Sequence, residues 1–464
     1  MKSSKTVDLT RGGIWITLLK YCLPLFGSAM VQQLYSLVDL LVVGNFAAEG
    51  ALAVDAIGNA TNVINILLAF ALGANSGCAV VIAKHFGEKN NKKVRETVNT
   101  AFISYAVLCG VLMAVGLGLG KLFLQALSVH QSYFDDCLSY LYIYVCSLPF
   151  VFLYNLGCGI CSALGDSKTP FIFLVISSLL NVVLDLIFVY VLHFDVAGAA
   201  WATFISQGLS CILTAIVLVR KLKSIQTEER PKRFDRGLLG ELTATSIPII
   251  LQQSFVSVGN FFIMKRINLI GEDATTGFTT AFKMIGMANM GVVNMTSGLA
   301  NFASQNKAAG EYERIKRGHL AVITFTLISS VIFLTLFITC AEPLTRLFVQ
   351  KEKLTPVAID YSRQFLTIVS GFLPVVAVKI VSDGAVRGCG GNVGFTVSTF
   401  TDLILRVVLV YILTSVGWGF SGVCWAWIIG WSVSTVLSII FYLNIKCLRG
   451  VKLFSGKNAG DKPN

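Results

Sequence analysis

The chain has 464 residues, of which 55% are hydrophobic and only 13% are charged. This composition is too apolar for a water-soluble protein of such length, so we expect a membrane protein. The formal net charge is +12, but most of the 37 Lys and Arg residues fall in connecting segments on one predicted side of the membrane. That distribution follows the positive-inside rule and indicates orientation, not nucleic-acid binding. We expect a multi-pass protein of the cell membrane with both termini in the cytoplasm.

Apolar stretches long enough to cross a bilayer recur along the whole chain. A helical span needs roughly 20 apolar residues, and these stretches do not alternate in the manner of barrel strands. The first is too long for a cleaved signal peptide and contains Asp39. The sequence therefore predicts an all-α polytopic membrane protein with twelve transmembrane helices, at 14–46, 52–84, 94–120, 133–161, 169–193, 195–219, 238–270, 275–305, 315–340, 355–386, 394–416 and 418–446.

The two halves of the chain repeat each other at low similarity. Gly198 and Trp201 recur as Gly422 and Trp425, 224 positions later. A charged connector at 223–236 separates an expected bundle at 1–222 from another at 237–464. Because six spans are an even number, the second half begins on the same side as the first. The two six-helix bundles are therefore predicted to be parallel, related by a pseudo-twofold axis along the membrane normal.

Ionisable side chains inside spans are costly and are functional candidates. Asp39 lies seven residues before the outer end of its helix and Asp185 eight residues before His193, which places both at a depth of ~10 to 12 Å. Thr203 falls at a similar depth on the next helix. Asn181 is one helical turn from Asp185, and Tyr35 is one turn from Asp39. We expect these five side chains to meet in the outer half of the first bundle.

The five side chains fit either of two coupling ions. Oxygens of Asp39, Asn181, Asp185 and Thr203 could bind Na⁺, since hard cations prefer oxygen ligands. Alternatively the two carboxyl groups could share a proton, because neighbouring buried carboxylates do not both remain ionised. A plain alternative is that they only make hydrogen bonds within the bundle. The second half has Gly259 and the region of Leu409 to Tyr411 at the equivalent positions, so coupling is expected in the first half only.

Other polar residues within spans have less specific roles. Lys379 with Asp383, and Asp402 with Arg406, are spaced to neutralise each other within one helix. Lys283 has no such partner and is a candidate for lining the central cavity, together with Gln33 and Gln253. Pro24 is expected to kink the first helix, as is Pro248 the seventh, because proline removes a backbone hydrogen bond.

Signatures of catalysis are weak. The twelve cysteines fall mostly in spans without metal-type spacing, and we expect small buried apolar side chains. The strings GDSKTP at 165–170 and RGCGGN at 387–392 lack the spacing of a nucleotide-binding loop and are expected to form tight interhelical turns. No nucleophile and base are paired in the pattern of an active site. We expect no enzyme and no cofactor beyond the coupling ion.

Several segments together resemble the multidrug and toxic compound extrusion (MATE) family, and within it the DinF-like prokaryotic branch. They are LPLFGSAMVQQLYSLVDLLVVGNF, GDSKTP, NVVLD, VAGAAWAT, SIPIILQQSFVSVGN and SQNKAAG. The resemblance implies twelve-helix antiporters with a V-shaped cavity that exchange cationic or amphipathic compounds for H⁺ or Na⁺. It implies a cation site at Asp39, Asn181, Asp185 and Thr203 with Tyr35 alongside, and a kinking proline at Pro24. The acidic residues of the related NorM-like branch are absent from the core of helix 7.

We therefore expect a monomeric antiporter in the lipid bilayer that exports organic cations or amphipathic drugs in exchange for H⁺ or Na⁺ by alternating access. The alternative is a flippase for lipid-linked or polyprenyl-type substrates, which would need a cationic central cavity. A membrane enzyme acting on lipids would need a reactive cluster near one interface, and the sequence offers none. A sensor or scaffold would give no reason for carboxylates at matched depth.

Overall fold

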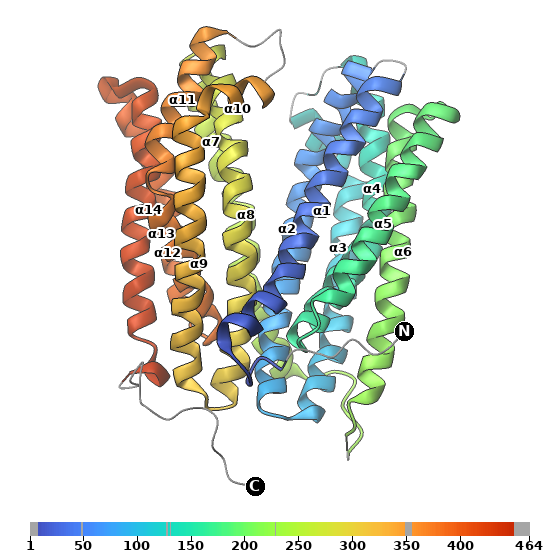
Figure 1. The fold of residues 1–464 in the computed structure, drawn as a ribbon. Helices are drawn as coiled ribbons and strands as arrows, with labels where there is room; N and C mark the ends of the chain where they lie inside the picture. Colours follow the sequence, from blue (N-terminus) through green and yellow to red (C-terminus); the bar gives the residue numbers. More distant parts are fainter. Residues whose placement is uncertain are drawn as a thin grey trace.

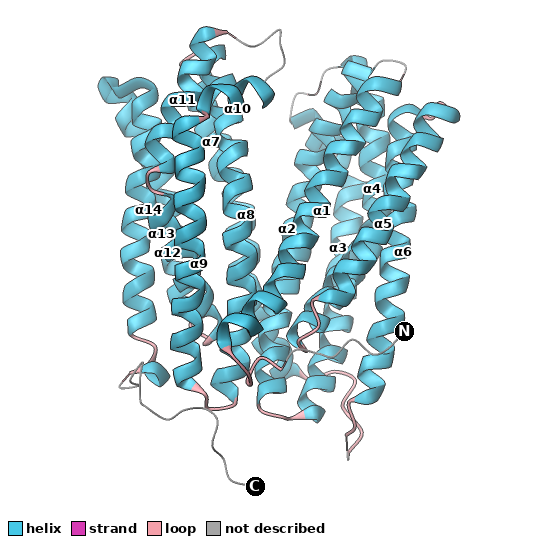
Figure 2. Cartoon of the chain, viewed as in Figure 1, coloured by secondary structure: helices cyan, strands magenta, loops and turns pink. Residues whose placement is uncertain are grey.

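The computed structural model describes residues 8–47, 50–126, 129, 131–227, 229–348 and 355–449. Within this part of the chain every regular element is a helix (Figure 2). The first bundle is formed by α1 (Ile14–Phe46), α2 (Gly50–Gly87), α3 (Asn91–Ala126), η1 (Gln131–Tyr133), α4 (Phe134–Ala163), α5 (Lys168–Asp185), η2 (Leu186–Val191) and α6 (Asp195–Ser224).

The second bundle repeats this plan with more interruptions. It consists of α7 (Arg236–Asn268), α8 (Glu272–Ala308), α9 (Tyr312–Thr339), α10 (Ala341–Phe348), α11 (Pro356–Ser370), α12 (Leu373–Gly388), α13 (Asn392–Leu413), η4 (Thr414–Trp418), α14 (Gly419–Leu443) and η5 (Lys446–Leu448). In both bundles a π-helical segment follows the fifth spanning helix, η2 after α5 and η4 after α13. This shared irregularity is a structural sign of the repeat.

The helices account for twelve membrane spans. Among the described residues, nine helical stretches are long and apolar enough to cross a membrane, and a tenth results when α11 and α12, bent by 55°, count as one span. One of the nine, Asn392–Leu443, has 52 residues, about 78 Å of helix, more than twice the thickness of a bilayer core. It breaks at Gly417, whose φ is +97°, so α13 and α14 are separate spans. The twelfth span is α8, which has 37 residues and is more polar. The predicted fold class is confirmed.

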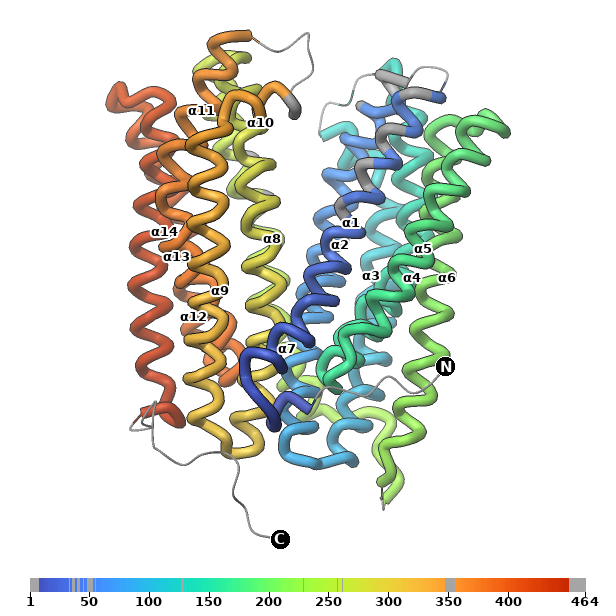
Figure 3. Tube along the Cα trace, in the orientation of Figure 1, coloured from blue at the N-terminus to red at the C-terminus, as the bar shows by residue number. Residues whose placement is uncertain are grey.

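The two bundles approach each other at one end and diverge at the other (Figures 1 and 3). The described chain begins and ends at the end where the bundles meet, beside the α2–α3 and α8–α9 turns (Figure 1). We call this the inner end, after the orientation expected from the positive-inside rule, and the opposite end the outer end. Helices α1, α2, α7 and α8 form the seam between the bundles.

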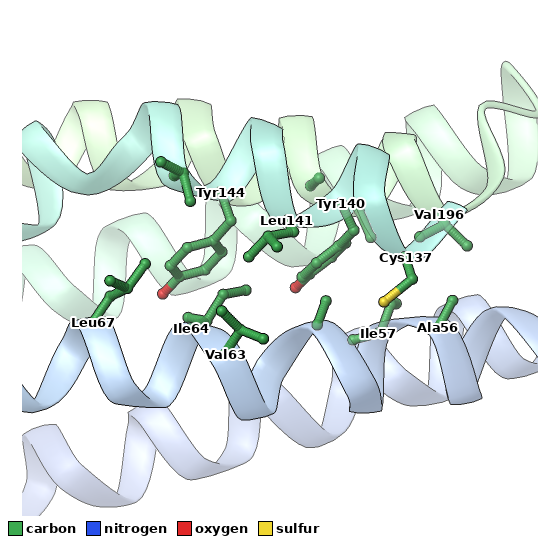
Figure 4. Close-up of a cluster of buried hydrophobic side chains, with 14 of the residues drawn as sticks. Ala56, Ile57, Val63, Ile64, Leu67, Cys137, Tyr140, Leu141, Tyr144 and Val196 are labelled. Carbon is green, nitrogen blue, oxygen red and sulfur yellow. The ribbon is translucent and has the colours of Figure 1, made fainter. Parts of the chain in front are cut away.

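Each bundle has its own apolar core. In the first, Tyr140, Leu141 and Tyr144 of α4 pack against Val63 and Ile64 of α2 (Figure 4). In the second, Phe278, Phe365 and Trp427 meet edge to face. Many large apolar side chains on the outside of the bundles are exposed, as a lipid-facing surface requires. A further buried cluster joins the two bundles at the seam, where Tyr21 and Cys22 of α1 pack with Met295 and Leu299 of α8.

Close backbone contact between the bundles at the inner end depends on glycine. Gly73 and Gly77 of α2 form a GxxxG pattern facing α7. A Cβ atom added at Gly77 would lie 2.7 Å from the Ser246 Cα atom, and one added at Gly73 would lie 2.8 Å from the Ile250 backbone nitrogen. Any side chain at these positions would therefore force α2 and α7 apart.

The two glycine-containing strings near the inner end form turns, as predicted. Gly165 has a φ of +84° and Gly390 a φ of +79°, a left-handed conformation that favours glycine. After Gly165, the Asp166 carboxylate accepts hydrogen bonds from the Thr169 backbone nitrogen (3.0 Å) and hydroxyl (2.6 Å), which caps the start of α5. The Gly165 turn sets the direction in which α5 enters the first bundle, and the Gly390 turn precedes α13 in the second.

Candidate functional site

The carboxyl groups of Asp39 on α1 and Asp185 on α5 lie within hydrogen-bonding reach of each other. Asp39 is 7% exposed and Asp185 is fully buried. Two ionised carboxylates repel and neither can donate a hydrogen bond, so the contact requires a proton on one of them or a cation between them. This arrangement is a proton- or cation-dependent contact between two helices.

The neighbouring polar groups are also buried. Asn181 is one turn before Asp185 on α5, and Thr203 comes from α6. Among the described residues, no hydrogen-bond partner of ordinary geometry is present for six buried atoms: Asp39 Oδ1, Asn181 Oδ1 and Nδ2, Asp185 Oδ1 and Oδ2, and Thr203 Oγ1. Buried polar atoms without partners are costly and need an explanation. Five of the six are oxygens, and oxygens are the ligands that hard cations prefer.

A small cavity adjoins this cluster. Its lining includes Tyr35, Asn181 and Thr203, and its volume is about 10 Å³, close to the least that holds one water molecule. The structure therefore brings together the five residues predicted from depth: four share the buried cluster, and Tyr35 lies at the cavity beside it. The chemistry available is exchange of a proton or binding of a small cation through oxygen atoms.

Two residues near the pair were not predicted. Tyr140 and Tyr144 of α4 are buried, and Tyr140 interacts electrostatically with both Asp39 and Asp185. Tyr144 interacts with Asp39 and Tyr35. Their spacing of four on α4 places them on one helix face. Since this spacing is equally typical of core aromatic residues, the sequence alone gave no signal that they belong to the site.

Asp185 is the last residue of α5, directly before the π-helical segment η2. Short π-helical segments frequently occur at functional sites, because they alter the backbone hydrogen-bond pattern of a helix. The equivalent segment η4 follows Leu413, which is not acidic. The nearest carboxylate before η4 on α13 belongs to Asp402. In the part of the chain that the structure describes, only the first bundle places an acidic side chain directly before the irregular segment.

The charged residues of the second bundle form the predicted pairs. Lys379 Nζ and Asp383 Oδ2 are 3.0 Å apart on α12, and Arg406 Nη2 and Asp402 Oδ2 are 2.5 Å apart on α13. Both pairs are buried and have an i, i+4 spacing. Their charges are therefore neutralised within single helices, as expected.

A central cavity of about 290 Å³ lies between the bundles near the inner end. Its lining comes from α1, α2, α4, α5, α7, α8 and α12, and Gln253 is among the lining residues. Gln32 also lines it, whereas the side chain of Gln33 lies outside the described residues. Tyr154 lines this cavity and interacts electrostatically with Tyr35, so the central cavity and the small cavity are neighbours. Polar groups from both bundles therefore face the same space.

Lys283 and Pro24 lie apart from the carboxyl pair. Lys283 is exposed on α8, on the same helix face as Asn294, Ser297 and Asn301, which line the central cavity farther inward. Helix α1 continues through Pro24, and the Ser28 hydroxyl donates a hydrogen bond to the Pro24 carbonyl oxygen (2.9 Å). The expected role of Pro24 as a kink stays a prediction.

Side chains of α8 close the inner end of the seam. Asn301 Nδ2 donates to the Tyr21 hydroxyl (2.9 Å), which donates to the Ser162 carbonyl oxygen (2.6 Å). Gln305 Nε2 donates to the Ala163 carbonyl oxygen (2.6 Å). All of these side chains are buried. The bonds join α8 of the second bundle to α1 and to the end of α4 in the first, so separating the bundles here requires breaking them.

Two parallel helical repeats around a central cavity, with a buried carboxyl pair in one of them, have the architecture of a multi-pass membrane transporter. The sequence model of the family described as MatE matches this chain twice, at residues 24–187 and 248–412. The chain belongs to this family, the multidrug and toxic compound extrusion transporters. It is a transporter and not an enzyme.

Individual relatives agree with this assignment. The chain is 26% identical over 387 residues to the probable multidrug resistance protein YpnP of Bacillus subtilis, covering 83% of this chain and 85% of YpnP. It is 19% identical over 446 residues to the multidrug export protein MepA of Staphylococcus haemolyticus, covering 96% and 97%. A solved MATE family transporter in an outward-facing conformation has the same fold, with a TM-score of 0.87 at 22% identity, covering 97% of this chain and all of the other.

Proposed function

We propose that this protein is a secondary antiporter that exports organic cations or amphipathic drug-like compounds in exchange for inward H⁺ or Na⁺. It would act as a monomer in the cell membrane with both termini in the cytoplasm. The observation that carries the proposal is the contact between the Asp39 and Asp185 carboxyl groups, which needs a proton or a cation. Names of relatives such as multidrug resistance protein and multidrug export protein support the drug-like substrate class.

The arrangement suggests how coupling would work. Asp39 lies on α1, which also lines the central cavity through Leu25, Ser28 and Gln32. Binding of the ion changes the net charge of the Asp39–Asp185 pair, which joins α1 to α5. A resulting movement of α1 would alter the central cavity, because α1 also lines it. A ligand shifts a conformational equilibrium only by its differential affinity for the two states. The Asp39–Asp185 pair supplies such a difference in affinity. A proton or Na⁺ is bound only in the conformation in which the two carboxyl groups lie together.

Flipping of lipid-linked or polyprenyl-type substrates is the second candidate. One observation favours it. Apart from tyrosine and cysteine, Arg387 is the sole ionisable side chain among the described residues that line the central cavity. A cationic cavity suits a diphosphate head group.

The test is transport by the purified protein in liposomes. Efflux of ethidium would be followed under an imposed pH gradient and, separately, an imposed Na⁺ gradient. We expect one gradient to drive efflux, which would identify the coupling ion. Absence of ethidium movement under both gradients, together with translocation of a fluorescent polyprenyl phosphate, would contradict antiport and favour the flippase.

A further inference from the structure

Arg387 lies where two cavities meet. It is the penultimate residue of α12 and is only 9% exposed. It lines the central cavity of about 290 Å³ and also an inner cavity of about 470 Å³. Val80 is the other described residue that lines both. The Arg387 side chain therefore stands between the central cavity and a space nearer the inner end.

No described residue forms an ion pair with Arg387, although the Asp383 carboxylate attracts it electrostatically. The Arg387 Nε atom is buried without a hydrogen-bond partner among the described residues. Asp383 is one turn earlier, but its carboxylate already binds Lys379 Nζ (3.0 Å), Ser398 Oγ (2.7 Å) and Ser438 Oγ (2.7 Å). The guanidinium group contacts the Phe395 ring at 5.6 Å, which offsets only part of the cost of burying a charge. A bound anion would supply the missing counter-charge.

Among the described residues that line the central cavity there is no carboxylate, whereas Glu88 and Glu241 line the inner cavity. The described lining of the central cavity is otherwise made of apolar side chains, hydroxyl groups and amides, including Asn75, Asn155 and Gln253. Amide nitrogens and hydroxyl groups can donate hydrogen bonds to an anion. The planar guanidinium group is well suited to a carboxylate or phosphate, because it can donate two parallel hydrogen bonds. The base of the cavity is therefore positive, whereas the carboxyl pair lies within the first bundle.

We propose that Arg387 binds an anionic group, a carboxylate or a phosphate, on the transported molecule. The substrates would then include amphipathic molecules that carry an anionic group, such as zwitterionic drugs, in addition to organic cations such as ethidium. This inference rests on the proposed export function and specifies the substrate class of its cavity. Because Arg387 borders both cavities, it can hold the anionic group as the cavity closes on one side and opens on the other.

Two pairs of fluorescent molecules provide the test. Rhodamine 110 carries a free carboxyl group, and rhodamine 123 is its methyl ester. Riboflavin phosphate carries a phosphate group, and riboflavin lacks it. Binding of each to the detergent-purified protein would be measured by equilibrium dialysis for the parent, Arg387→Gln, Arg387→Lys and the control Arg363→Gln, which changes an exposed arginine of α11. The two pairs distinguish recognition of a carboxylate from recognition of a phosphate.

We expect Arg387→Gln to raise the Kd of at least one anionic dye by about ten- to a hundredfold, the range for a lost hydrogen bond to a charged group. The Kd of the matched uncharged or esterified dye should not change, and Arg387→Lys should restore part of the affinity. An equal loss for both members of each pair would assign Arg387 a structural role and overturn the inference. Absence of saturable binding of both anionic dyes to the parent would overturn it as well.

The binding assay needs no ion gradient, so it separates this inference from the proposed antiport. If the Arg387-dependent preference is found but neither gradient drives transport in liposomes, antiport is wrong and the anion site stands. If a gradient drives transport of rhodamine 123 and the preference is absent, antiport stands and the anion site is wrong.

Discussion

Asp39 of α1 and Asp185 of α5 are far apart in the sequence, yet their carboxyl groups meet inside the first bundle. The second bundle has the same order of helices and the same π-helical segment, but Gly259 stands where the repeat places Asp39. One bundle thus holds an ion-dependent contact, whereas the charged pairs of the other are neutralised within single helices. The proposed antiport would need only one such contact, provided that the bundles move against each other.

Closure of the inner end should depend on Gly77. We expect Gly77→Leu to push α2 and α7 apart, since even a Cβ atom would meet the Ser246 backbone at 2.7 and 2.8 Å. The measurement is the distance between spin labels at Lys89 and Glu311, two exposed residues at inner turns of different bundles. The distance should lengthen in Gly77→Leu, and transport should fall.

The matched control for this substitution is Gly118→Leu on α3, where an added Cβ atom meets nothing within 4 Å. It should leave both the label distance and the transport rate unchanged. An unaltered distance in Gly77→Leu would show that the inner end is not held by this close approach.

Asp166 should stabilise the inner end of the first bundle. Burial alone would raise the pKa of Asp166, but hydrogen bonds from Lys221 and Thr169 outweigh it and lower the pKa below its ordinary value. A lowered pKa in the folded state adds stability that is present at neutral pH and is lost as the pH falls through that value. We expect Asp166→Asn to lower the free energy of unfolding at pH 7 by about 1 to 3 kcal/mol, between the effects of a lost helix cap and a broken buried ion pair.

Thermal unfolding in detergent at pH 7 and below pH 4 would check this expectation. The difference between the parent and Asp166→Asn should shrink at the acid pH. Glu229→Gln removes an ion pair with Lys92 between exposed side chains and should have little effect at either pH. A constant difference at both pH values would show that the Asp166 charge does not contribute.

Cys447 should be the most reactive of the twelve cysteines at neutral pH. A hydrogen bond from the Cys389 thiol, with help from the Lys307 charge, lowers the pKa of Cys447 to about 6 despite partial burial. The thiolate is the reactive form, so maleimide labelling should increase as the pH rises through about 6 and then level off. Cys389→Ala should move this increase to higher pH, and Cys447→Ser should abolish it. Labelling of the parent that increases only near pH 8.5, the usual thiol value, would contradict the assignment.

The sequence was sufficient to predict those features that depend on the bilayer. Long apolar stretches determine the spans, and helical rise converts residue number to depth, which is why Asp39, Asn181, Asp185 and Thr203 could be placed together. The intrahelical pairs Lys379–Asp383 and Asp402–Arg406 followed from spacing alone. Depth and spacing are one-dimensional quantities, and a single sequence contains them.

Features that depend on which helix faces which were not predicted. Tyr140 and Tyr144 join the site because α4 packs against α2 and α6 within the first bundle, and nothing in their own pattern distinguishes them from core residues. Arg387 was assigned to a turn, and it lines two cavities because α12 packs against α8 of the seam. The π-helical segment η2 also lacks a sequence signature.

The most direct test of the account compares driven and undriven transport by Asp39→Asn and Asp185→Asn in liposomes. We expect both variants to bind ethidium and to exchange it when no ion gradient is present, but to lose efflux driven by the pH or Na⁺ gradient that works for the parent. Asp360→Asn, which changes an exposed carboxylate of α11, should behave like the parent. Gradient-driven efflux at the parent rate in both Asp39→Asn and Asp185→Asn would contradict coupling through this pair.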